Sequence, residues 1–164
     1  MSEGYSIPRR EALKTLGALG VGLAAVGLVQ GTAEAQAPAL GQNESAQDAM
    51  KRLFGGKPIK DGAAIIKFDI PLIAENGSVV PVSVNVDSPM TPASYVKHIY
   101  VVADKNRIPV VTRVTLAPEA GKAAVGANIR LGETGEVRAI VEQSDGTLLQ
   151  VAREVKVTVG GCGG

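Results

Sequence analysis

Apolar and polar residues alternate with a period of two through most of the chain after residue 65, which is the pattern of half-buried β-strands. In residues 82–87, for example, three valines alternate with Ser, Asn and Asp. Strands are expected at about residues 66–70, 82–87, 95–103, 110–116, 125–131, 137–141 and 148–159. Because no helical pattern interrupts these seven segments, they predict an all-β fold, an immunoglobulin-like antiparallel β-sandwich.

Turn-forming residues separate the expected strands, as a sandwich of short strands requires. They occur at Asn76-Gly77, at Asp104-Lys105-Asn106, at Pro118 with Gly121, at Gly132 to Gly135, and at Asp145-Gly146. The strand at residues 95–103 is more continuously apolar than the others. Its residues Tyr95, Ile99, Tyr100 and Val101 are compatible with the core or with an interface.

One segment has a different period. Residues 42–54 carry apolar side chains at three- and four-residue spacing, among them Met50, Leu53 and Phe54, and Gly55-Gly56 follows as a stop signal. The pattern predicts one short amphipathic helix, and we expect its apolar face to pack against the main domain.

The amino-acid composition argues against several classes of function. The net charge is +1 and there is no basic run, so nucleic acid is not expected as a partner. One Cys and one His cannot supply a four-ligand zinc site, a cysteine-ligated iron–sulfur cluster or a CxxC redox pair. We therefore expect no metal and no cofactor. The sole histidine, His98, is interpreted as a strand residue that faces solvent or a partner.

The N-terminal segment has the features of an export signal. Arg9 and Arg10 precede an uncharged apolar run over residues 16–29, and a stretch of small residues follows it. The run is shorter than the roughly 20 residues of a membrane-spanning helix, so a permanent membrane anchor is not expected. Residues 1–35 are interpreted as a cleaved signal, with cleavage after Ala37 as the alternative.

The paired arginines, followed by Leu13 and Lys14, are similar to the twin-arginine motif, with the general secretory route as the alternative. Either route predicts the periplasm. Twin-arginine systems export folded proteins, and because this chain offers no cofactor ligands, a co-exported folded partner is the better explanation.

The chain ends in Gly160, Gly161, Cys162, Gly163 and Gly164. Glycines on both sides give the cysteine no neighbour that would bury it, whereas an unpaired cysteine is usually buried and inert. In an oxidising compartment an exposed thiol requires an intermolecular disulfide or a reactive role. We therefore assign function to Cys162 and treat the four glycines as a flexible arm, on which Cys162 reaches about 10 Å beyond Val159.

This arrangement divides the chain into a signal at 1–35, an N-terminal segment with the helix at 36–57, a sandwich at 58–159 and the arm at 160–164. No residue near the thiol would activate it, because the closest charge is the terminal carboxylate, which disfavours the thiolate. Only a few per cent thiolate is then expected at neutral pH. The pattern indicates a carrier, whose thiol is activated by the pocket that receives it, and not an enzyme.

The terminal GGCGG, joined to residues 155–159 and placed behind a twin-arginine leader, resembles the SoxY family, the sulfur carriers of the thiosulfate-oxidising Sox system. Residues 74–77 with 80–82, the segment 95–106, and Arg130-Leu131 are also similar to that family. The resemblance covers essentially all of the mature chain. It implies covalent attachment of sulfur intermediates to Cys162.

The resemblance also implies partners. These are SoxZ, a small β-protein without an export signal of its own that would form a heterodimer with this chain, a c-type cytochrome that loads thiosulfate, a manganese hydrolase that releases sulfate, and a sulfur dehydrogenase. A disulfide between two heterodimers through Cys162 is left open.

Two alternatives compete with the carrier. In one, the chain is an exported interaction protein that uses Cys162 only for an intermolecular disulfide. In the other, the terminal Gly163-Gly164 carries a thiocarboxylate, as ubiquitin-like sulfur carriers do, and Cys162 is dispensable.

Overall fold

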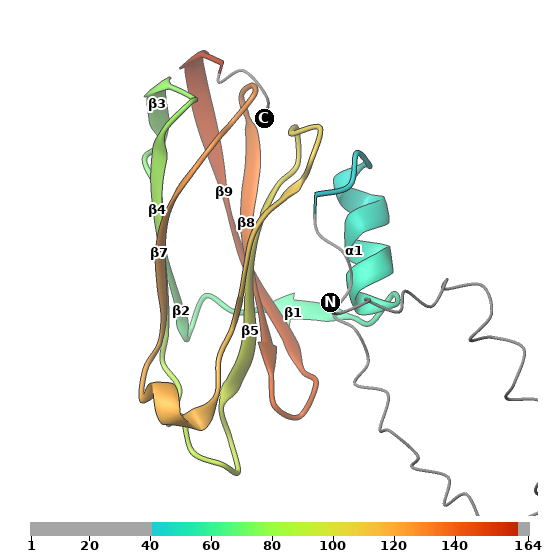
Figure 1. Ribbon diagram of the computed structural model, residues 1–164, viewed down its shortest axis with the longest axis vertical. Helices are drawn as coiled ribbons and strands as arrows, with labels where there is room; N and C mark the ends of the chain where they lie inside the picture. Colours follow the sequence, from blue (N-terminus) through green and yellow to red (C-terminus); the bar gives the residue numbers. More distant parts are fainter. Residues whose placement is uncertain (1–40, 161–164) are drawn as a thin grey trace, which may run out of the picture. The chain divides into compact units, whose positions relative to one another are not determined.

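The structure is a computed structural model that describes residues 41–160. These residues form one α-helix, nine strands and one short 3-10 helix (Figure 1). The elements are α1 (Ala46–Phe54), β1 (Ile59–Asp61), β2 (Ile66–Asp69), β3 (Ile73–Asn76), β4 (Val80–Val86), β5 (Val96–Ala103), β6 (Val110–Thr115), η1 (Pro118–Ala120), β7 (Ala123–Ile129), β8 (Gly135–Gln143) and β9 (Leu148–Val159).

The strands form two sheets that lie face to face, as the expected sandwich requires (Figure 1). The larger sheet has the order β1-β9-β8-β5-β6, and β3 joins it by pairing with β9. The smaller sheet has the order β2-β4-β7. The sequence prediction of an all-β, immunoglobulin-like sandwich is thus confirmed.

The structure has two strands more than expected, and both pair in parallel. The seven expected strands correspond to β2 and to β4 through β9, whereas β1 and β3 were not expected. Both are short and both run parallel to β9, with Ile59 opposite Leu148 and Ile73 opposite Lys156. The sandwich is therefore antiparallel except at these two edge strands, which are too short to show an alternating pattern.

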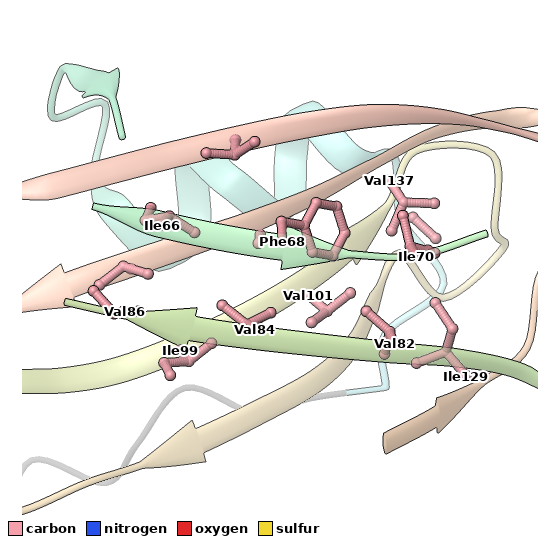
Figure 2. Close-up of a cluster of buried hydrophobic side chains, with 14 of the residues drawn as sticks. Ile66, Phe68, Ile70, Val82, Val84, Val86, Ile99, Val101, Ile129 and Val137 are labelled. Carbon is pink, nitrogen blue, oxygen red and sulfur yellow. The ribbon is translucent and has the colours of Figure 1, made fainter. Parts of the chain in front are cut away.

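The main core lies between the two sheets and consists of aliphatic side chains and one phenylalanine (Figure 2). Val84 and Ile99 are completely buried there, and burial of a side chain of this size contributes roughly 1.5 to 3 kcal/mol. The labelled side chains are Ile66, Phe68, Ile70, Val82, Val84, Val86, Ile99, Val101, Ile129 and Val137. Valine and isoleucine thus fill a core that has few aromatic residues.

Helix α1 covers the outer face of the larger sheet and closes a second core cluster. The helix begins at Ala46, four residues later than expected, because the Ser45 hydroxyl accepts a hydrogen bond from the Asp48 amide and caps it. Gly55 ends it in the left-handed region, with φ of 61°. Phe54 meets Tyr100 edge to face, with 5.1 Å between ring centroids. The predicted packing of the helix against the main domain is confirmed.

Strand β5 contains residues that the sequence left compatible with the core or with an interface. In the structure both faces of this strand pack into a hydrophobic core. Ile99 and Val101 are buried between the sheets, and Tyr100 is buried in the cluster under α1. Tyr95 packs partly buried against the inter-sheet core. None of the helices in the described residues is both long and apolar enough to cross a membrane.

His98, on β5, is less exposed than we expect of a histidine that faces solvent, because only 16% of its side chain is exposed. Its Nδ1 lies 3.1 Å from Thr115 Oγ1, and its Nε2 lies 4.0 Å from Glu142 Oε2. Burial lowers the pKa of His98 below 6.5, Lys97 and Arg113 lower it further, and Glu142 opposes these effects. The folded protein therefore favours the neutral imidazole.

Acidification from about pH 7.5 to about pH 5.5 should reduce the free energy of unfolding through this group. Unfolded His98 binds its proton near pH 6.5 and folded His98 only at lower pH, so the contribution is present above pH 6.5 and is lost as the pH falls through the folded pKa. Urea unfolding of the untagged protein across this range measures the loss. His98→Gln should reduce it, and an equal loss in H98Q would assign the effect to other groups.

Candidate functional site

Only the first residue of the predicted arm, Gly160, lies within the described residues. Cys162, Gly161, Gly163 and Gly164 lie outside them, as do Arg9 and Arg10 and the two cleavage sites. The described part of the site is therefore the root of the arm, the end of β9 and the loops around it. In Figure 1 this end of the sandwich is where β9 finishes beside β3.

Gly77 holds the last residue of β9 from one side. Its N–H donates to the Val159 carbonyl at 2.7 Å, and its own carbonyl accepts from the Leu131 N–H at 2.8 Å. Asn76, in register with Val159, uses its side-chain oxygen to accept from the Ser78 N–H at 2.9 Å, which shapes the turn. One residue thus connects the end of β9 to the loop after β7.

Asn106 fixes that loop from within. It is the only fully buried polar residue in the described part of the chain, with 6% exposure. Its Oδ1 accepts from the Gly132 N–H at 3.0 Å, and its Nδ2 donates to the Arg130 carbonyl at 2.7 Å. A buried amide with both ends hydrogen-bonded holds a defined geometry, because losing a partner would leave an unsatisfied polar group. Residues 130–132 are therefore held in one place.

An ion pair anchors the start of the loop that carries Asn106. The Arg138 guanidinium donates to Asp104, with Nη2 2.8 Å from Oδ2, and to Glu136 Oε2 at 2.7 Å. The hydrogen bond to Asp104 raises the pKa of Arg138 above its ordinary value. Asp104 thus connects this loop to β8, the strand next to β9.

The arm leaves the sandwich in contact with the fixed loop. A Cβ on Gly160 would collide with the Gly132 carbonyl oxygen, a backbone atom, so glycine is needed here for close approach. Slightly earlier, the Val157 N–H donates to the Thr134 hydroxyl at 2.9 Å. The hydrogen bonds from Gly77 to Val159 and from Val157 to Thr134 therefore hold the end of β9, from which the chain continues toward Cys162.

This geometry sets the point from which the arm can reach. Val159 is the last residue held by a backbone hydrogen bond, and Cys162 follows it three positions along the chain, a span that covalent geometry limits to about 10 Å. A protein that reacts with the thiol must therefore come close to the end of the sandwich.

The described residues contain no group of three or more His, Cys, Asp or Glu that could hold a metal ion. His98 lies near the start of β5, opposite Glu142 of β8, whereas Asn106 follows the other end of β5. Sequence patterns did not predict Gly77, Asn106 or Gly132 as parts of the site, because they suggested turns and nothing more.

Fold and sequence together define a class, an immunoglobulin-like sandwich whose last strand is held at its end by a backbone hydrogen bond and is followed, three residues later, by the only cysteine in the sequence. The family model described as "Sulfur oxidation protein SoxY" matches residues 50–162, most of the chain. The chain belongs to the SoxY family, which confirms the resemblance noted in the sequence. Its role is that of a sulfur carrier in sulfur oxidation.

A solved structure supports this assignment. The sulfur carrier protein SoxY from Chlorobium limicola f thiosulfatophilum is 33% identical, with a TM-score of 0.57, over 69% of this chain and 96% of that one. A superoxide reductase (neelaredoxin) variant from Ignicoccus hospitalis has a TM-score of 0.51 at 18% identity, over 70% of this chain and 93% of that one, and shows likeness of fold alone. A search of the curated proteins found no match.

Proposed function

We propose that the chain holds thiosulfate-derived intermediates covalently on Cys162 and presents them to enzymes in the periplasm. The observation that carries the proposal is the position of the only cysteine in the sequence, flanked by glycines and three residues beyond Val159, the hydrogen-bonded end of β9. A thiol on so thin a stem suits insertion into a narrow pocket. In the sequence the nearest charged side chain, Lys156, lies six residues before Cys162, so we expect the partner to supply activation.

The chemistry follows thiol–disulfide logic. Loading joins the Cys162 sulfur to the sulfane sulfur of thiosulfate by a new S–S bond. The thiol proton leaves, and two electrons pass to an oxidant, for which the family suggests a c-type haem on the loading partner. Water then cleaves the bond to the sulfonate group, which releases sulfate and one proton and leaves a persulfide on Cys162. A dehydrogenase then takes six electrons from that sulfane sulfur, three water molecules supply its oxygens, and seven protons leave, which gives a sulfonate on the Cys162 sulfur. Water cleaves the remaining S–S bond, which releases a second sulfate and one proton and regenerates the thiol.

Export and pairing complete the proposal. The twin-arginine signal at Arg9 and Arg10 would carry the folded chain across the membrane, and SoxZ would travel with it as a heterodimer. Because the twin-arginine route moves folded proteins, a partner without a signal of its own would cross the membrane bound to this chain.

Purification of the exported protein from cells grown on thiosulfate tests the proposal. The expected result is a two-chain complex in which intact mass spectrometry finds sulfane or thiosulfonate mass on Cys162. A Cys162 found only in a disulfide-linked dimer, with no added sulfur, would support the interaction-protein alternative. A chain found alone and unmodified would contradict both the pairing and the carrier role.

A further inference from the structure

The free edge of β7 differs from the other sheet edges in the described part of the chain. β7 is the last strand of the smaller sheet, and all seven of its residues pair with β4 without a register shift. It contains no charged residue and no proline. Natural sheets usually protect their edges with charges, prolines, bulges or very short strands. β7 has none of these protections.

The other edge strands of the described residues are protected. β1, β2 and β3 have three or four residues each and carry charged side chains, among them Lys60, Lys67 and Glu75. β6 carries Arg113, and its pairing with β5 is interrupted by a register shift. β7 is thus the edge best suited to accept another strand.

The register shows which backbone groups of β7 point away from β4. Just past the end of β4, the Asp87 N–H donates to the Ile65 carbonyl in the register of the β2–β4 pair. Odd-numbered residues of β4 therefore hydrogen-bond toward β2, and even-numbered ones bond the odd-numbered residues of β7. The N–H and C=O groups of Ala124, Gly126 and Asn128 consequently point to the free edge.

The carbonyl of Arg130 supports this direction independently. Arg130 has the parity of the three outward residues, and its carbonyl accepts a hydrogen bond from Asn106, in the loop between β5 and β6. This partner comes from outside the smaller sheet. No described strand pairs with the outward groups that precede it on β7. The edge is therefore closed at one end by Asn106 and open along residues 124–128.

Gly126, in the middle of β7, is not explained by the packing of the described residues. A Cβ at this position would meet no atom within 4 Å, and its φ is not in the positive region that favours glycine. Glycine weakens a strand interior, and where no bulge or bend requires it, it often marks the close approach of another backbone. A second backbone along this edge would account for the residue.

The charges at the two ends of β7 decide between a second copy of this chain and a different protein. Lys122 and Arg130 are exposed directly before and after the strand. Two copies paired antiparallel with full overlap would place Lys122 opposite Arg130 of the copy, and parallel copies in register would place each cation opposite itself. Like charges directly opposite each other destabilise a strand pair. The edge therefore suits a strand of another protein with acidic residues at both ends.

We propose that β7 forms the subunit interface of the two-chain complex, and that the partner chain adds one strand, uncharged in its middle and acidic at both ends, to this edge. The inference rests on the pairing proposed above and names the surface through which it occurs. Main-chain hydrogen bonds at Ala124, Gly126 and Asn128 supply affinity, and the two flanking cations fix the register. The smaller sheet then grows from three strands to four.

Hydrogen exchange of single amides, measured by NMR on the purified two-chain complex, tests the inference. Val125 and Ala127 bond β4 in any case, so a free edge would show slow and fast amides in alternation along β7. We expect no alternation in the complex, because the outward amides at 124, 126 and 128 should exchange at least about a hundredfold more slowly than those of an open edge. Alternation that persists in the intact complex would overturn the inference and leave the pairing and the carrier role intact.

A substitution at the centre of the edge gives a second readout. Gly126→Pro removes the central outward N–H without removing a hydrogen bond to β4, as edge strands tolerate. It should raise the dissociation constant of the complex about tenfold, measured by analytical ultracentrifugation over a dilution series. Gly126→Ala keeps the N–H and adds a methyl group in open space, so G126A should dissociate as the wild type does.

The flanking charge is tested separately. Lys122→Glu should raise the dissociation constant about threefold to tenfold, and salt should reduce this effect because the side chain is exposed. Lys67→Glu, an equal charge reversal on the other edge strand of the same sheet, is the matched control and should dissociate normally. Wild-type dissociation constants in both G126P and K122E would overturn the inference. If G126P does not fold, K122E and the exchange pattern of the wild type decide.

Two other outcomes would also overturn it. Concentration-dependent protection of the outward amides in this chain without its partner would assign the edge to a second copy. Purification of the exported chain without any second chain would remove the proposed pairing, and the interface with it. The sulfur found on Cys162 reports the carrier role independently of both outcomes.

Discussion

Cells in which Cys162 is replaced by serine should lose thiosulfate oxidation through this system, while the purified variant keeps the stability of the wild type. A serine hydroxyl cannot form the S–S bond on which loading depends. The substituted residue lies beyond the last contact that holds the root, so the free energy of unfolding should change by less than about 0.5 kcal/mol. Thiosulfate consumption by the cells and urea unfolding of the protein measure the two effects.

Thr158→Ser, an exposed and conservative change near the end of β9, is the matched control and should oxidise thiosulfate normally. Normal oxidation by C162S would contradict the carrier account. It would favour the thiocarboxylate alternative, in which Gly164 carries the sulfur and Cys162 is dispensable.

Asn106→Ala should destabilise the protein by about 1 to 3 kcal/mol, because it removes two hydrogen bonds of a buried amide, one to the Gly132 N–H and one to the Arg130 carbonyl. The substitution should also loosen the end of β9, because the Leu131 N–H donates to the Gly77 carbonyl and the Gly77 N–H donates to the Val159 carbonyl. We expect faster hydrogen exchange at the Gly77 and Leu131 amides, measured by NMR, alongside the lower unfolding midpoint in urea.

Two further variants bracket this result. Asn106→Asp keeps the acceptor for Gly132 but places a buried carboxylate oxygen against the Arg130 carbonyl oxygen, so at neutral pH it should destabilise the protein at least as much as N106A. Asn85→Ala, on β4 and only partly buried, should cost less than about 0.5 kcal/mol. If N106A were as stable as the wild type, with unchanged exchange at Gly77, the loop would not be what fixes the root.

Much of the fold was predictable because the alternation of apolar and polar residues is a local signal. Val82, Val84 and Val86 share one face in the sequence and share the core in the structure. The strands β1 and β3 carry no such signal. Each has three or four residues and exists because it pairs with a part of β9 that lies far along the chain, so only the assembled sheet defines it.

In the candidate site, too, a local sequence signal was readable and contacts between distant residues were not. Cys162 could be proposed from sequence because its glycine neighbours and terminal position argue against ordinary burial, and it lies outside the described residues, so it stays a prediction. The support for the arm could not, because Asn106 has the same appearance in sequence whether a turn exposes or buries it. Its partners Arg130 and Gly132 lie 24 and 26 residues away, a separation that no local pattern spans. Gly160 likewise suggested flexibility alone, whereas its contact with Gly132 shows a steric requirement.

The most direct test of the carrier role is a pulse of thiosulfate labelled in its sulfane sulfur, followed by an unlabelled chase. Mass spectrometry of the C-terminal peptide should find the label on Cys162 within the pulse. The label should then leave Cys162 during the chase and appear in sulfate. Label that never reaches Cys162 while thiosulfate is consumed, or that stays there through the chase, would contradict the conclusion that this chain carries sulfur between enzymes.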